Sequence, residues 1–126
     1  MEEQEFFRIV DEFNKYEGVE EVFLLDSEGE VVFKSSAINP LTNKESRAIL
    51  KAWKEKETSL TYQNFRYAII KNDDIQLAAK NISGGKGNIA GSITKEGDSY
   101  LLIHTSQDTD MILLEWSIFV NKLAWS

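Results

Sequence analysis

Cysteine is absent from this 126-residue sequence, and histidine and proline occur once each, as His104 and Pro40. Without cysteine there is no disulfide framework, no thiol nucleophile and no zinc site built on thiolates, a composition that fits a reducing, cytoplasmic setting. The sequence has no apolar run of about 18 residues, and it begins Met1-Glu2-Glu3 instead of with a basic and then apolar stretch. We therefore expect neither a membrane span nor a signal peptide.

Basic residues are outnumbered, since 21 acids against 14 bases give a formal net charge of −7. This balance disfavours a bulk attraction to nucleic acid or to anionic membranes. The charge is unevenly distributed along the chain. Residues 1–30 hold 11 acids and 2 bases (net −9), residues 31–95 hold 5 and 11 (net +6), and residues 96–126 hold 5 and 1 (net −4). The sequence thus places a basic segment in the middle of an acidic protein.

Clusters of proline, glycine and serine that would mark a linker are also missing, so we predict one domain over residues 1–126. Apolar residues at helical spacing predict three helices, over residues 3–16, 43–56 and 111–125. Thr42 and Glu45 have the spacing of a reciprocal capping box, and Asp108 or Thr109 is expected to cap the last helix. Short apolar runs between turn residues predict three hairpins, 19–25 with 31–33, 66–71 with 75–80, and 88–94 with 100–105.

The last predicted helix is apolar on an unusually broad face, which Met111, Leu114 and Ile118 widen. Such a helix is expected to be covered on most sides, by the sheet and by the first helix.

Residue types that carry catalysis are sparse. His104 lies in an alternating strand, and without cysteine or a second histidine a transition-metal site would need carboxylates alone, none of which recur at ligand spacing. His104 is therefore expected to be a structural or surface residue. The glycine-rich stretch at 83–87 contains Lys86, but it has no Gly-Lys-Ser/Thr sequence and no helix follows it, so we interpret it as a flexible hairpin link and not a phosphate loop. We expect no enzymatic activity, no cofactor and no metal.

Five basic residues fall within or at the ends of the predicted meander strands, close enough to share one edge region: Arg66, Lys71, Lys80, Lys86 and Lys95. They have two interpretations. They could form a solvated face that resists edge-to-edge aggregation, as lysines on sheets often do. Alternatively, they could meet an acidic partner, for which complementary charge steers encounter and sets register.

The order of elements and several local strings resemble those of the profilins, small proteins that bind actin monomers. The resemblance spans almost the whole chain and rests on three stretches: residues 26–50, with Asp-x-x-Gly-x-Val, Lys34-Ser35-Ser36, Pro40, Glu45 and Ile49; residues 66–71, Arg-Tyr-Ala-Ile-Ile-Lys; and residues 84–95, where Gly-Gly-Lys-Gly leads to Ile93-Thr94-Lys95. It implies an α+β fold, an antiparallel β-sheet with the N- and C-terminal helices on one face and the middle helix on the other. The short chain and the acidic first helix suggest a divergent, archaeal member.

The resemblance also implies a function. A profilin binds actin through the exposed meander strands and the start of the last helix, caps the barbed face of the monomer, suppresses spontaneous nucleation and favours nucleotide exchange. The actin-binding positions that this implies are Arg66, Lys71, Lys80, Lys86, Asn88, Lys95 and Glu115. We accordingly expect a monomeric, cytoplasmic, cytoskeleton-associated protein.

The family's second site binds proline-rich peptides between the terminal helices through stacked aromatic rings. The positions that the resemblance assigns to it are Phe6, Phe7, Phe119 and Trp125. The family's tryptophan and tyrosine near the N-terminus would be replaced by Phe6 or Phe7, and its hairpin tryptophan falls on Val32. Losing an indole removes stacking area and an N–H donor, so binding of proline-rich peptides is expected to be weak or absent.

Two other functions remain open from the sequence. A roadblock- or longin-like scaffold has a similar order of elements, but it works as a dimer that regulates a small GTPase, so a stable homodimer would favour it and a monomer would favour a profilin. A phosphoinositide-binding module could use the same lysines, and its binding would weaken as salt screens the charges.

Overall fold

One antiparallel sheet organises residues 1–82 and 84–126, the part of the chain described by the structure, which is a computed structural model. The order of its seven strands is β2-β1-β7-β6-β5-β4-β3. The strands are β1 (Val19–Asp26), β2 (Val31–Lys34), β3 (Ser59–Tyr62), β4 (Phe65–Asn72), β5 (Gln76–Asn81), β6 (Asn88–Ile93) and β7 (Ser99–Thr105). The helices are α1 (Glu3–Phe13), α2 (Asn43–Lys54) and α3 (Leu113–Ala124).

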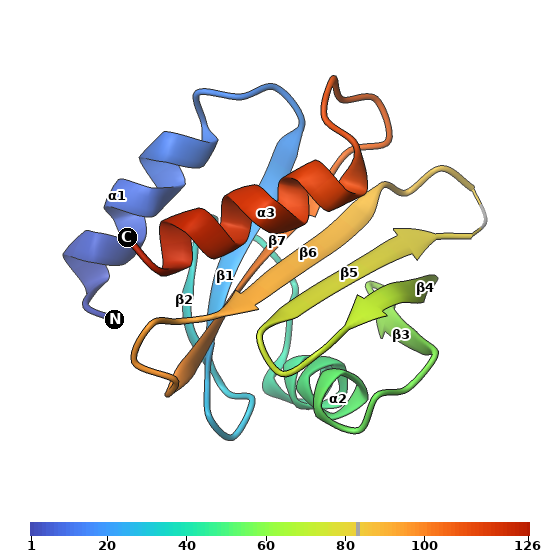
Figure 1. The fold of residues 1–126 in the computed structure, drawn as a ribbon, viewed down its shortest axis with the longest axis horizontal. Helices are drawn as coiled ribbons and strands as arrows, with labels where there is room; N and C mark the ends of the chain where they lie inside the picture. The colour runs from blue at the N-terminus through green and yellow to red at the C-terminus, as the bar shows by residue number, and fades with distance from the viewer. Residues whose placement is uncertain (83) are drawn as a thin grey trace.

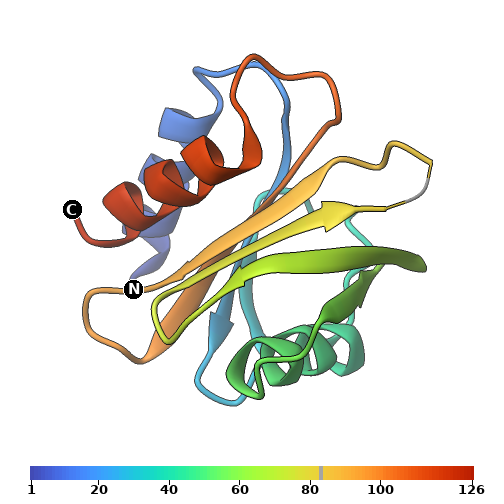
Figure 2. The same ribbon diagram turned by 45° about the vertical axis from the view of Figure 1, so that its right-hand side comes forward.

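The helices cover the two sides of the sheet, and this confirms the predicted arrangement. The terminal helices α1 and α3 lie on one side and α2 lies on the other (Figures 1 and 2). Successive strand residues point to opposite sides, so each strand feeds both layers. In β1, for example, Val22 and Leu24 pack under the terminal helices, whereas Phe23 and Leu25 pack under α2.

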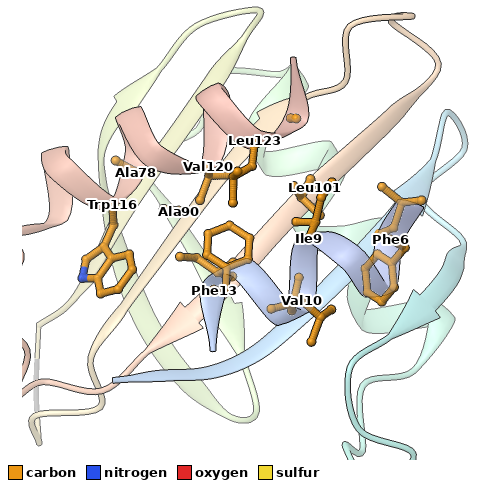
Figure 3. Close-up of a cluster of buried hydrophobic side chains, with 14 of the residues drawn as sticks. Phe6, Ile9, Val10, Phe13, Ala78, Ala90, Leu101, Trp116, Val120 and Leu123 are labelled. Carbon is orange, nitrogen blue, oxygen red and sulfur yellow. The ribbon is translucent and has the colours of Figure 1, made fainter. Parts of the chain in front are cut away.

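Aromatic and aliphatic side chains of α1 and α3 fill the first layer. Phe6, Ile9 and Phe13 of α1 meet Trp116 and Val120 of α3, and all five are fully buried above the sheet (Figure 3). Because these residues recur every three or four positions, they form one stripe on each helix. On the other side, Ile49 and Trp53 of α2 play the same part.

The three predicted hairpins form, and β7 also pairs with β1, which joins the early and late parts of the chain. Strand β3, however, was not predicted. It is only four residues long, and just Leu60 and Tyr62 of it are buried. The hairpin to β4 turns at Gln63 and Asn64, which both have positive φ (51° and 68°). Two such residues fit a two-residue turn of the type that matches strand twist.

The predicted helix caps are partly wrong. Thr42 does accept a hydrogen bond from the Glu45 N–H (3.2 Å), as expected. The Glu45 carboxylate, instead of bonding back to Thr42, accepts from the Gln63 N–H (2.7 Å), because the β3–β4 turn brings that donor within reach. Only the Thr42 half of the capping box is therefore formed. The Glu45 side chain instead ties α2 to the β3–β4 turn.

Helix α3 begins at Leu113 with Ile112 in the N-cap position, so the expected caps Asp108 and Thr109 are wrong. The Glu115 carboxylate accepts from the Ile112 N–H (3.1 Å) and satisfies one donor of the first turn. The Thr109 hydroxyl is used elsewhere, since it donates to the Met111 carbonyl and accepts from the Trp116 indole N–H. Among the described residues, no helix combines the length and apolar character needed to cross a membrane.

Candidate protein-binding surface

Helix α3 covers only part of its side of the sheet. It packs on β6 and β5, whereas β4 and β3 lie beyond its edge (Figure 1). Thr61 and Arg66, which are paired across these two outer strands, are both exposed. The sheet therefore has an uncovered area directly beside the start of the last helix.

Strand register locates four of the seven predicted actin-binding residues on this area, because cross-strand partners point to the same side of a sheet. Ala78 is buried beneath the terminal helices, and Lys71 is its partner on β4. Lys80 follows Ala78 by two residues on β5 and pairs with Asn88 on β6. On β4 the partner of Lys80 is Ala68, and Arg66 precedes Ala68 by two residues. We call the surface formed by Arg66, Lys71, Lys80 and Asn88 the open sheet face.

A β-bulge sets the side on which Lys71 lies. The register of β4 shifts between Ile69, which is opposite Ala79, and Lys71, which is opposite Ala78, and Ile70 is the extra residue. A bulge of this kind leaves one residue unpaired and bends its strand. The side chain of Ile70 is 57% exposed, so it adds apolar surface next to Lys71.

A groove of about 200 Å³ connects the open sheet face to the start of α3. Lys80 and Asn88 line it from the sheet, and the segment from Gln107 to Leu113 lines it from the other side. Ile112 projects here and is 65% exposed. The site thus combines a cation, an amide and an isoleucine on two elements that are far apart in the sequence.

The outer side of α3 corrects the expectation that this helix would be covered on most sides. Leu114 and Ile118 are 47% and 63% exposed, because α1 and the sheet cover only the stripe that contains Trp116 and Val120. Exposed apolar residues near a charged surface are typical of protein-binding sites, where the centre is apolar and the rim is polar. Ile70, Ile112, Leu114 and Ile118 are thus exposed apolar residues that the sequence reasoning did not assign to the site.

The basic residues of the meander form no close ion pair with a described carboxylate, although the pKa of Asp73, which burial alone would raise, is lowered by backbone hydrogen bonds from Gln76 and Ile75 and, after them, by the charge of Lys71. Within the part of the chain that is described, lysine and arginine ion pairs to carboxylates involve Lys15, Arg47, Lys51 and Lys56. None involves Arg66, Lys71, Lys80, Lys86 or Lys95. On α2, by contrast, Arg47 and Lys51 are paired with Glu30 and Glu55.

Three of the seven predicted actin-binding residues lie away from the open sheet face. The Lys86 ammonium lies 4.7 Å from the centre of the Phe65 ring, which alternation places on the α2 side of β4. Lys95 is at the other end of β6 from Asn88, about 17 Å along the strand, and its N–H donates to the Ala124 carbonyl (3.3 Å). Glu115 caps α3 and lines a groove with Tyr16 of the α1 side.

The four aromatic residues assigned to a proline-rich ligand are not equivalent. Phe6 has no exposed surface and packs against Phe33, so its ring faces are inaccessible. Phe119 is half-buried against Phe13 and Tyr16. Phe7 and Trp125 are 40% and 42% exposed, but the Trp125 indole N–H already donates to the Ile93 carbonyl (2.9 Å). Weak or absent binding of proline-rich peptides stays a prediction.

His104 was expected to be a structural or a surface residue, and the structure shows that it is buried. It is nine-tenths buried among Tyr62 and Tyr67, and its Nε2 lies 2.7 Å from the Lys86 carbonyl oxygen. Its Nδ1 faces the Glu20 carboxylate at 3.5 Å. In residues 1–82 and 84–126, no three histidine, aspartate or glutamate side chains gather closely enough to hold a metal ion.

Comparison with known proteins places these features in context. No family model matches the sequence. The sequence is 62% identical to Loki profilin-3 of Lokiarchaeum sp. (strain GC14_75) over 126 residues, which is 100% of both chains.

Solved structures share the fold at low sequence identity. LokiProfilin2, solved in a complex with rabbit actin, superimposes with a TM-score of 0.80 at 21% identity, covering 98% of this chain and 95% of that one. LokiProfilin1 gives 0.77 at 19% identity with the same coverage. Acanthamoeba castellanii profilin IB gives 0.65 at 16% identity, covering 85% and 82%. These likenesses confirm the predicted fold.

Proposed function

The chain belongs to the profilin family, and from this premise we propose that it binds monomeric actin and restrains its polymerisation. In this proposal it caps the barbed face of the monomer, suppresses spontaneous nucleation and favours nucleotide exchange. It acts in the cytoplasm, with the cytoskeleton, as a single non-enzymatic domain. Family membership leaves no ground for the alternative of a roadblock- or longin-like scaffold.

The open sheet face carries the proposal. It has free cations at Arg66, Lys71 and Lys80, and exposed apolar side chains lie on either side, at Ile70 and along the start of α3. Apolar area supplies most of the affinity of a protein interface, whereas charges steer encounter and fix orientation. The fold neighbour LokiProfilin2 was solved in a complex with actin, which supports this partner.

The distribution of charge strengthens the argument for a specific orientation. The whole chain has a net charge of −7, so an acidic partner is repelled by most of the surface. The meander gathers several cations that form no ion pair with the described carboxylates, and these offer a local site of attraction. An acidic surface of actin would therefore dock on this side. Lys86, two residues before Asn88, would contact it at the edge of the open sheet face, and Lys95 and Glu115 lie further from that face.

A polymerisation assay with pyrene-labelled actin tests the proposal. The wild-type protein should slow spontaneous polymerisation, and Lys71→Glu combined with Lys80→Glu should abolish this effect while leaving the thermal unfolding midpoint nearly unchanged. Lys44→Glu combined with Lys51→Glu is the matched control, because it changes the net charge equally but lies on α2, across the sheet. Absence of any effect by the wild-type protein, or equal inhibition by the open-face variant, would contradict the proposal.

Two further ligands belong to the proposal as predictions. Phosphoinositide headgroups would use the same free cations, and vesicles that contain them should compete with actin less well as salt rises. A proline-rich peptide should bind weakly or not at all, because Phe6 is inaccessible and the Trp125 donor is occupied.

A further inference from the structure

The glycine-rich link between β5 and β6 is bonded to the sheet at its end, where the Gly87 carbonyl accepts from the Asn81 N–H (3.0 Å) and the backbone of Lys86 is also held. Both backbone polar groups of Lys86 are bonded to side chains from three different strands. Its N–H donates to Asn81 Oδ1 (3.3 Å), and its carbonyl oxygen contacts His104 Nε2 (2.7 Å) and the Tyr67 hydroxyl (3.1 Å). Asn81, Tyr67 and His104 are all buried, whereas Lys86 is exposed, so these bonds are partly shielded from water.

The chemistry of this contact fixes the proton positions. A carbonyl oxygen only accepts, so a separation of 2.7 Å requires the proton of the imidazole on Nε2. With that proton in place Nε2 cannot accept, and the Tyr67 hydroxyl therefore donates to the same carbonyl. Burial raises the pKa of Tyr67 to about 12, so this hydroxyl keeps its proton at neutral pH. The Lys86 carbonyl thus accepts two partly buried hydrogen bonds.

The chain reaches this position only because glycine follows. Gly87 has a φ of +84°, and a Cβ there would lie 1.8 Å from the Thr105 carbonyl oxygen. The backbone at Gly87 therefore lies directly on β7, which brings the preceding carbonyl over His104. A link whose composition predicts flexibility is consequently anchored at its end nearest the sheet.

The anchored residue connects the buried cluster to the proposed binding surface. The Lys86 ammonium lies over the Phe65 ring, which is a favourable arrangement for a cation. Asn88 of the open sheet face, the first residue of β6, follows Lys86 by two residues. We infer that Tyr67 and His104 are positioning residues for actin binding, since they hold Lys86 in a binding-ready conformation before the partner arrives. This inference rests on the proposed function. Preorganisation of this kind removes the cost of ordering a loop on binding.

Three variants test the inference against a matched control. Tyr67→Phe removes only the hydroxyl, and His104→Phe removes the ring N–H donor. His104→Gln retains an N–H near the Nε2 position and should preserve binding. The control is Tyr62→Phe, a buried tyrosine of the same cluster whose hydroxyl accepts from the Asn39 and Gln63 amides and does not contact the link.

Actin affinity and amide hydrogen exchange are measured together. Tyr67→Phe and His104→Phe should weaken actin binding by about two- to tenfold, the range of one lost hydrogen bond, whereas Tyr62→Phe and His104→Gln should not. Exchange of the Lys86 amide, measured on the free protein, should accelerate in the first two variants only. In a Lys86→Ala background, Tyr67→Phe should weaken actin binding much less than in the wild type, because it acts through Lys86.

Each other outcome is decisive. If Tyr67→Phe accelerates exchange at Lys86 but leaves actin affinity unchanged, the proposed function stands and the positioning role is wrong. Equal losses of affinity with and without Lys86→Ala would also overturn it. If the wild-type protein does not bind actin, the proposed function fails first, and the positioning role fails with it.

Discussion

Lys80 on β5 and Asn88 on β6 are direct partners across an antiparallel ladder, and both line the groove that runs to the start of α3. This pair connects two properties of the surface. Lys80 supplies a charge without a carboxylate partner, and Asn88 supplies an amide whose oxygen is buried and has no hydrogen-bond partner among the described residues. A partner that inserts between the sheet and α3 therefore meets polar groups at the bottom of the groove and Ile112 at its rim.

Salt should weaken actin binding mainly through the rate of association. Free surface charges act over about 10 Å at 0.1 M salt and over less as salt rises. The association rate constant of the wild-type protein should fall clearly with increasing salt, and that of the variant with Lys71→Glu and Lys80→Glu should not. Stopped-flow fluorescence measures both. The α2 variant with Lys44→Glu and Lys51→Glu should keep the wild-type dependence.

Replacing Gly87 should destabilise the fold far more than replacing Gly97, although both residues have φ near +80°. A methyl group on Gly97 meets nothing within 4 Å, so Gly97→Ala should cost only the backbone strain of about 1 kcal/mol. On Gly87 it meets the Thr105 carbonyl oxygen at 1.8 Å, so the link must move off β7. Denaturant unfolding measures the difference, and similar losses for both variants would contradict the close approach.

The neighbouring residues Phe6 and Phe7 provide a test of the core. Phe6 is fully buried, whereas Phe7 is 40% exposed. Phe6→Ala should lower the free energy of unfolding by about 3–5 kcal/mol, as expected when a buried phenyl group leaves a cavity. Phe7→Ala should have a much smaller effect. Comparable effects in equilibrium unfolding would show that the packing of α1 differs from that described.

Alkaline pH should destabilise the protein through its buried tyrosines. Burial raises the pKa values of Tyr62 and Tyr67 from 10.0 to about 12. In the unfolded chain these groups ionise at lower pH, so their contribution to stability is complete below pH 10 and is lost as pH rises towards 12. The free energy of unfolding should decline over this range, and less steeply in Tyr67→Phe. A decline of the same steepness in that variant would contradict the assignment.

The order of elements was predictable from the sequence because it depends on local periodicity. Helix α2 illustrates this, since Thr42 marks its beginning and its apolar stripe faces the sheet as predicted. Strand β3 was missed because it is short and half polar, although Gln63 and Asn64 together were a usable turn signal. The second partner of Glu45 was not predictable, because the Gln63 N–H reaches it only after the sheet has formed.

The candidate site was predictable only in part, and for a similar reason. Lys80 and Asn88 share a surface because regular strands fix their directions. Lys86 and Lys95 lie in connections, where the direction of a side chain depends on tertiary contacts such as the Phe65 ring. The exposure of Leu114 and Ile118 could not be inferred, because an apolar helix face has the same pattern whether the fold or a partner covers it.

The bulge at Ile70 reverses which residues of β4 face which side of the sheet. Before it, Tyr67 and Ile69 face α2, and an uninterrupted strand would have pointed Lys71 into the same apolar layer. The extra residue turns Lys71 outward and returns Asn72 to the α2 side, where its amide reaches the Ala52 carbonyl. One inserted residue thus lets a single strand serve the core along its first half and place Lys71 on the open sheet face along its second.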